Sequence, residues 1–128
     1  MKLKKFKILI CLSVVFLFSR QAILFATAAP EIPIKGMVTM VDFGSKIKSC
    51  LPCQIMAPIL EKLEKAYAGR AAVIFLDVRE NQETVDGLGV QTIPLQIFFD
   101  KNGREVFRHV GVFREEAIIE QFKKMGVK

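Results

Sequence analysis

Met37-Val38-Thr39-Met40-Val41-Asp42-Phe43, followed after a short loop by Cys50-Leu51-Pro52-Cys53, is the stretch that decides the fold of this chain. The first segment is apolar nearly throughout, which is typical of a strand buried on both faces. The second segment places two thiols one helical turn apart. A Cys-x-x-Cys beside a β-α-β pattern predicts a dithiol redox site. For the motif taken alone, a structural cysteine pair or half of a zinc site is the alternative.

The residues after the cysteines predict a small α/β domain. A helix from near Cys50 to about Ala68 should turn Ile55, Ile59, Leu60 and Leu63 inward. Asn102-Gly103 between two strand-like runs indicates a hairpin. The remaining predicted elements are a strand over Ala71–Val78, a helix over Asn81–Leu88, strands over Leu95–Phe99 and Glu105–Val110, and a helix over Arg114–Met125. The order is β-α-β-α-β-β-α, which predicts a central mixed sheet flanked by helices.

The first 28 residues have the pattern of a secretory signal peptide. Lysines at residues 2–7 precede an apolar run of eleven residues, Ile8–Phe18, and Ala26-Thr27-Ala28 supplies small residues for cleavage. The run is shorter than the about 20 apolar residues that span a bilayer, although further apolar residues after Arg20 leave an uncleaved anchor open. We therefore expect a periplasmic or otherwise extracytoplasmic protein, anchored in the membrane if the signal is kept. The expected divisions are residues 1–28 (signal), 29–36 (extended leader) and 37–128 (domain).

The charge of the chain belongs mainly to this signal. Five of the 19 basic residues and none of the 13 acidic residues precede Ala29, so the mature chain carries 14 basic against 13 acidic side chains, about +1. No basic patch remains to indicate a nucleic-acid ligand. The 100 mature residues suffice for one small domain, which we expect to be a monomer. Its only cysteines are Cys50 and Cys53, and so short a loop is better explained by reactivity than by stapling.

The two thiols are expected to have different roles. Cys50, at the start of a helix, has the unpaired N–H groups and the dipole to stabilise its thiolate, so we expect it to be the nucleophile. Cys53, one turn further in, should lose solvent and resolve the mixed disulfide. Leu51 and Pro52 lie between them, where a substrate would approach. A structural zinc needs four ligands, whereas the mature chain offers two thiols and His109, so we expect neither a metal nor a cofactor.

Asp42 is an anomaly in its apolar strand. A buried carboxylate is costly unless it is neutral or partnered. It is either a strand-end side chain turned to water or a carboxyl of raised pKa that exchanges a proton with Cys53 through water. His109, next to Arg108, is expected to be solvated and without a catalytic role. The methionines at positions 37, 40, 56 and 125 are expected to fill the core.

Several short segments occur in the order and register of a single family. They are Val41-Asp42-Phe43, Cys50-Leu51-Pro52-Cys53, Ala57-Pro58-Ile59-Leu60, Gly89-Val90-Gln91-Thr92-Ile93-Pro94, Lys101-Asn102-Gly103 and Val110-Gly111. Over essentially the whole mature region the chain resembles thioredoxin and its exported relatives. The resemblance implies that Pro94 is cis and lies against the dithiol, with the backbone of Ile93 offered to a substrate. It also implies that Asp42 is the buried proton carrier and that Gly111 leaves room for a substrate chain.

The chain departs from the family pattern around the dithiol. Ser49 stands in place of the tryptophan that usually precedes the first cysteine, and Gly44 in place of an aromatic residue. Two extra residues lengthen the loop before Cys50, and Gln54 stands where a basic residue is frequent. Near Ile74 the chain lacks the lysine that commonly lies close to the buried aspartate.

The function that these residues favour is a thiol–disulfide oxidoreductase outside the cytoplasm, acting as a reductant. Its expected partners are a membrane-embedded thiol reductase as electron donor and oxidised substrate proteins, including cytochrome c apoproteins. A disulfide-forming oxidase of the same fold is the first alternative, separated from the reductase by its reduction potential. The others are a Cu(I)-binding metallochaperone that uses Cys50 and Cys53, with His109 as a candidate third ligand, and a non-catalytic binding module.

Overall fold

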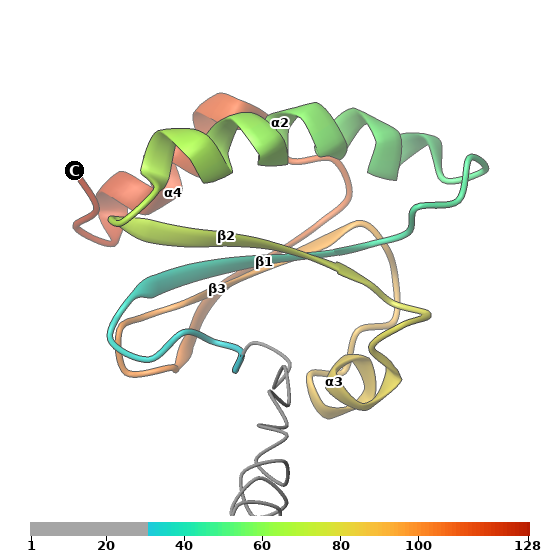
Figure 1. The fold of residues 1–128 in the computed structure, drawn as a ribbon, viewed down its shortest axis with the longest axis horizontal. Coiled ribbons are helices and arrows are strands. Elements are labelled where there is room, and N and C mark those ends of the chain that lie inside the picture. Colours follow the sequence, from blue (N-terminus) through green and yellow to red (C-terminus); the bar gives the residue numbers. More distant parts are fainter. Residues whose placement is uncertain (1–30) are drawn as a thin grey trace, which may run out of the picture.

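The computed structural model describes residues 31–128, so the expected signal peptide, residues 1–28, lies outside the described residues. The described part follows the expected order of strands and helices (Figure 1). Its elements are β1 (Val38–Gly44), α2 (Leu51–Tyr67), β2 (Ala71–Asp77), α3 (Gln82–Gly87), β3 (Leu95–Phe99), β4 (Glu105–Val110) and α4 (Glu115–Lys124). None of the described helices is long and apolar enough to cross a membrane.

The four strands form one mixed sheet in the order β2-β1-β3-β4. β1 and β2 are parallel, as expected for strands joined through a helix. β3 runs antiparallel to both β1 and β4. The helices α2 and α4 cover one face of the sheet, and α3 lies on the other (Figure 1). This is the α/β thioredoxin fold predicted from the sequence.

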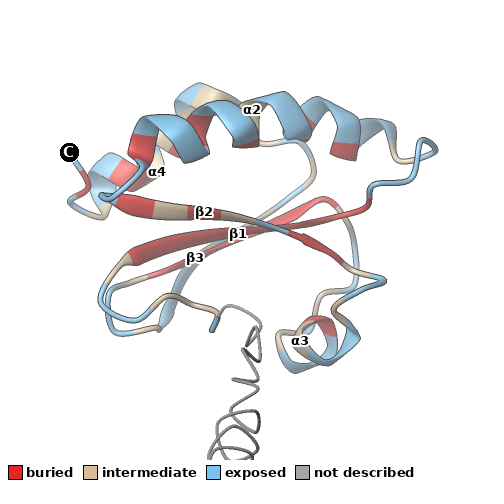
Figure 2. Cartoon of the chain, in the orientation of Figure 1, coloured by how far each residue is buried: buried red, intermediate tan, exposed pale blue. Residues whose placement is uncertain are grey.

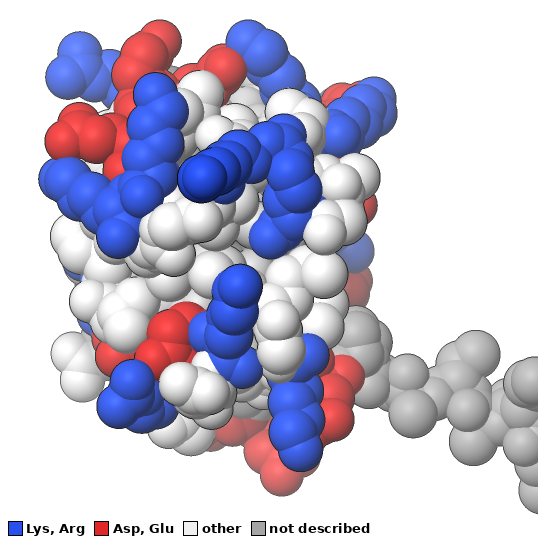
Figure 3. Space-filling model, turned by 90° about the vertical axis from the view of Figure 1, so that its left-hand side faces the viewer, with Lys and Arg blue, Asp and Glu red and all other residues white. Residues whose placement is uncertain are grey.

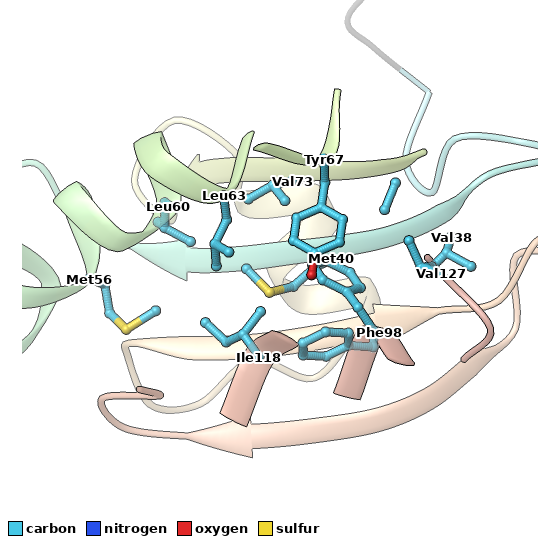
Figure 4. Close-up of a cluster of buried hydrophobic side chains, with 12 residues drawn as sticks. Val38, Met40, Met56, Leu60, Leu63, Tyr67, Val73, Phe98, Ile118 and Val127 are labelled. Atoms are coloured by element: carbon cyan, nitrogen blue, oxygen red, sulfur yellow. The ribbon is translucent and has the colours of Figure 1, made fainter. Parts of the chain in front are cut away.

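Two hydrophobic clusters fill the space on either side of the sheet. The cluster beneath α2 and α4 includes Met40, Met56, Leu63, Phe98 and Phe122 (Figure 4). The cluster on the α3 side is built from residues that alternate with these along the strands, including Val41, Phe43, Ile97 and, from α3, Val85. Buried residues accordingly run along the sheet and the inner faces of the helices (Figure 2). The methionines that the structure buries here, Met40 and Met56, confirm their expected role in the core.

One expectation about α2 is wrong. Ile55 was expected to face inward, but it is 54% exposed. The buried stripe of the helix instead passes through Cys53, Met56, Leu60 and Leu63, at spacings of three and four residues. Ile55 lies two residues from Cys53, which is about 200° around the helix, and so it faces solvent. Cys53 therefore belongs to the buried face of α2.

Candidate active site

The loop between β1 and α2 carries the chain from the sheet to Cys50, and it is anchored near both ends. The carboxylate of Asp77, at the end of β2, accepts the backbone N–H of Lys46 at 2.9 Å and that of Arg79 at 3.0 Å. These two N–H groups lower the pKa of Asp77 to about 2. Near the other end, the Gln54 side chain donates to the carbonyl of Lys48. The longer loop noted in the sequence is thus held in place by side chains.

Cys50 and Cys53 are joined by a disulfide across the first turn of α2, with their Cα atoms 5.3 Å apart. That separation lies in the ordinary range for a disulfide. Cys50 occupies the N-cap position and is half-buried, whereas Cys53 is only 4% exposed. Within the described residues, α2 has no side-chain cap and no acidic residue in its first turn, so no carboxylate there offsets its positive end. The arrangement favours a thiolate on Cys50 and shelters Cys53.

The Ile93–Pro94 peptide bond is cis, as the resemblance implies. Leu95 lies opposite Phe43 in the sheet, so Pro94 stands at the edge where β1 runs into the loop that leads to Cys50. Gly111 donates its N–H to the Pro94 carbonyl at 2.8 Å and has a φ of 95°, a conformation that favours glycine. A Cβ atom on Gly111 would meet nothing within 4 Å, so the space beside it is open. Ile93 is half-buried against the cluster on the α3 side.

Asp42 is completely buried, so the interpretation of a strand-end side chain turned to water is wrong. Its Oδ1 accepts a hydrogen bond from Gln96 Nε2 at 2.7 Å. Burial raises the pKa of Asp42 to about 6, and the hydrogen bond from Gln96 works in the opposite direction. The sequence reasoning missed Gln96. The signal was available, because Gln96 is a lone polar residue in an apolar strand just as Asp42 is.

A cavity of about 460 Å³ opens between α2 and the neighbouring strand edge, and Cys53 forms part of its wall. Ala57, Leu60 and Phe75 supply further apolar lining, while Lys46, Glu61 and Glu64 add charged groups. Near Ile74, where the family commonly has a lysine, Phe75 is the residue opposite Asp42. The ring of Phe75 lies over Gly44. The two departures from the family pattern, the missing lysine near Ile74 and the glycine in place of an aromatic residue at position 44, are therefore in contact with each other.

The surface around the dithiol is apolar at several points. Leu51 is 67% exposed, and Pro52 and Ile47 are exposed as well. Figure 3 shows the end of the molecule opposite the start of α2, where Lys and Arg side chains are interspersed with Asp, Glu and uncharged residues. That end therefore carries charged residues of both signs, whereas the exposed apolar side chains of Ile47 and Leu51 lie near Cys50.

The side chain of His109 is less exposed to solvent than the sequence predicts. It is half-buried, its ring stacks on Phe113 with the centroids 4.1 Å apart, and its Nε2 lies 3.3 Å from the Val112 carbonyl oxygen. In residues 31–128 no group of three or more His, Cys, Asp and Glu side chains is placed to hold a metal ion.

The model of the thioredoxin family matches residues 31–124, which include every site residue described above. The chain belongs to the thioredoxin family. With its Cys50–Cys53 pair it is a thioredoxin-type thiol–disulfide oxidoreductase.

Individual thioredoxins match over most of their length. The thioredoxin of Staphylococcus aureus is 38% identical over 98 residues, covering 68% of this chain and 93% of the relative. The crystal structure of Fasciola hepatica thioredoxin superimposes with a TM-score of 0.62 at 30% identity, over 71% of this chain and 83% of the other. An N21Q mutant thioredoxin from Halobacterium salinarum NRC-1 gives 0.61 at 32% identity, over 71% and 75%. The chain shares the fold of these thioredoxins. Residues around its dithiol, including Gly44 and Phe75, differ from the family pattern.

Proposed function

We propose that this member of the thioredoxin family works outside the cytoplasm and reduces disulfides in substrate proteins. The observation that carries the proposal is the asymmetry of the two sulfurs, since Cys50 lies half-exposed at a helix start while Cys53 is buried behind it. A sulfur that attacks a protein disulfide must be reached from solvent. The sulfur that completes the reaction needs only to reach its neighbour.

The reaction begins with the reduced dithiol. The Cys50 thiolate attacks one sulfur of the substrate disulfide, forming a mixed disulfide and releasing the other substrate sulfur as a thiolate. Asp42 takes the proton of the Cys53 thiol through water, and the Cys53 thiolate then attacks Cys50 Sγ. The second substrate sulfur leaves, and the two electrons that reduced the substrate have come from the dithiol. With a pKa of about 6, Asp42 is mostly ionised at pH 7 and can accept this proton.

The substrate chain is proposed to lie against the edge formed by Pro94 and Gly111. The open space beside Gly111 and its hydrogen bond to the Pro94 carbonyl support this position. The backbone of Ile93 would pair with the substrate. Exposed Leu51 and Pro52 would cover its apolar side chains.

The location and direction rest on the sequence. The signal-like pattern of residues 1–28 supports export, with a membrane-embedded thiol reductase as the electron donor. Proline before the second cysteine and isoleucine before the cis-proline accompany a reducing role in the family that the chain resembles. Oxidised proteins, including cytochrome c apoproteins, are the proposed substrates, and the protein is proposed to act as a monomer.

Reduction of insulin by the mature domain tests the chemistry. With dithiothreitol as electron donor, we expect insulin to precipitate faster than with dithiothreitol alone, and Cys50→Ser to remove the acceleration. Undiminished acceleration in Cys50→Ser would overturn the proposal. The reduction potential, measured against glutathione, tests the direction. A potential well above that of the glutathione pool would replace the reductase with a disulfide-forming oxidase.

A further inference from the structure

We propose that Gln96 is a positioning residue for the proton of Asp42. By donating to Oδ1, it keeps that oxygen an acceptor and directs the carboxyl proton to Oδ2, the oxygen on the side of Gly44 and Phe75. The proposal rests on the proposed function in one respect, because the position of the proton on Asp42 matters for activity only if Asp42 exchanges a proton with Cys53.

The sheet places the two side chains together. Gln96 is directly opposite Asp42 in the antiparallel pair of β1 and β3, so both side chains point to the same face. That face is the one beneath α2, because Met40 and Phe98, each two residues along from one of them, pack under α2 and α4. Both residues are completely buried, and Gln96 Nε2 lies 2.7 Å from Asp42 Oδ1. The pair is therefore fixed by backbone register as well as by the hydrogen bond.

The two oxygens of Asp42 have different surroundings. Oδ1 accepts from Gln96, whereas Oδ2 has no hydrogen-bond partner among residues 31–128. A Cβ atom at residue 44 would lie 3.4 Å from Oδ2 and 2.8 Å from Phe75 Cε2, so Oδ2 stands beside the Phe75 ring. Phe75 and Cys53 share the wall of the 460 Å³ cavity. Since the N–H of Gln96 occupies Oδ1, a proton on the carboxyl group lies on Oδ2, the oxygen on the side of Phe75, whose ring lines the same cavity as Cys53.

The groups around Asp42 leave Gln96 as its polar contact. β2 presents the uncharged Phe75 opposite Asp42, and α2 contributes Cys53, Glu61 and Glu64 to the wall of the cavity that Phe75 also lines. Lys46 also lines the cavity, but its ammonium group pairs with Glu80 at 3.1 Å.

On the other side, Gln96 is flanked by β4. His109 of β4 is opposite Gln96, one strand further from Asp42. Among the described residues, the bond from Gln96 is thus the hydrogen bond that opposes the effect of burial on the pKa of Asp42.

The Gln96 amide, on β3, acts differently on Asp42 from the lysine that the family commonly has on β2, near Ile74. A lysine adds a full positive charge, which favours the ionised carboxylate strongly. The amide carries no charge near neutral pH, and its one hydrogen bond to Asp42 stabilises the carboxylate by a smaller amount. The pKa of Asp42 therefore stays raised, yet low enough for the carboxylate to serve as a base near neutral pH.

Substitution of Gln96 by methionine tests the proposal, because it keeps the side chain's length and removes the N–H. In the oxidised protein, we expect the Asp42 carboxyl carbon, followed by ¹³C NMR, to titrate about one pH unit higher in Gln96→Met. The pH at which the reduced protein reaches half its maximal rate with insulin should rise by the same amount. Gln121→Met, which alters a half-buried glutamine of α4, is the matched control and should leave both values unchanged.

Two results would overturn the proposal. One is a folded Gln96→Met protein in which Asp42 titrates as in the parent. The other is a shift of the rate profile that persists when Gln96→Met is combined with Asp42→Asn, because the effect would then not pass through the carboxyl group.

A third measurement uses the unaltered chain, so that it does not depend on the folding of a variant. The side-chain amide resonance of Gln96 should move with the same midpoint as the Asp42 carboxyl carbon, and an amide resonance that ignores that midpoint would contradict the proposal. These NMR titrations are made on the disulfide form. They can therefore succeed even if the protein fails to reduce insulin, which would overturn the proposed function alone.

Discussion

The ring of Phe75 lies over Gly44 so closely that a Cβ atom at residue 44 would come within 2.8 Å of Phe75 Cε2. The two residues come from adjacent parallel strands, β1 and β2. Glycine at position 44 therefore leaves the room that the Phe75 ring occupies, beside Asp42 and the cavity that Cys53 lines.

The substitution Gly44→Ala should destabilise the protein by about 1–3 kcal/mol, because the added methyl group overlaps the Phe75 ring. In a Phe75→Leu background, the same change should cost at least about 0.5 kcal/mol less. Urea unfolding of the four proteins in this cycle measures both values. Equal costs in the two backgrounds would show that residue 44 and residue 75 do not compete for the same space.

The substitution Asp42→Asn should stabilise the folded protein at neutral pH. The pKa of Asp42 is about 6 in the folded state against an ordinary value of 3.8. As the pH rises from 3.8 to about 6, the unfolded state therefore loses this proton before the folded state does, and the free energy of unfolding of the parent falls. The cost of the ionised carboxylate is about 3 kcal/mol once both states are ionised, and it disappears below about pH 4. Guanidinium unfolding from pH 4 to 8 should show the advantage of Asp42→Asn growing with pH. An advantage that is independent of pH would point to packing instead.

Asp77→Asn should have the opposite effect, and so serves as its counterpart. The pKa of Asp77 is lowered to about 2 by the N–H groups of Lys46 and Arg79, so its contribution to stability is present above its ordinary pKa of 3.8 and is lost as the pH falls toward 2. The variant should be less stable than the parent at pH 7 and should approach it in acid. Thermal unfolding at pH 7 and pH 2.5 checks this. A larger loss at the lower pH would contradict the sign.

Cys53→Ser should trap the substrate on the enzyme. The half-exposed Cys50 still attacks, but the sulfur that would release the mixed disulfide is missing, so the covalent complex accumulates. Mass spectrometry of the reduced variant with insulin should show one adduct per chain, removable by dithiothreitol. Cys50→Ser, in which the remaining thiol is buried, should form far less. Equal adduct in the two variants would remove the assigned difference between the sulfurs.

The sequence predicts strands best where apolar runs are bounded by turns. The bounds of two strands agree with the sequence prediction at both ends, namely Leu95–Phe99 and Glu105–Val110. A proline precedes the first strand, and the Asn102-Gly103 turn separates the two. The inward face of α2 was harder to predict, since Cys53, Ile55 and Met56 are all apolar and only packing against the sheet decides among them. Ile55 was therefore placed on the wrong face.

The residues of the site also differ in how far the sequence alone predicts them. The spacing of the two cysteines indicates a redox site, and Asp42 is recognisable as the polar residue in an apolar strand. The cis bond before Pro94 followed from the family resemblance, because proline alone favours trans. The pairing of Asp42 with Gln96 depends on the register between β1 and β3, strands more than fifty residues apart in the chain. Local sequence patterns do not specify that register.

The loop before Cys50 has two fixed points, Lys46 held by Asp77 and Lys48 held by Gln54, with Ile47 between them. Ile47 projects into solvent from a segment whose path is set by its neighbours. Its side chain can consequently be exchanged for a charged, aromatic or small one without rerouting the backbone. For protein engineering, position 47 offers a place to retune which proteins dock beside the dithiol while the redox machinery stays as it is.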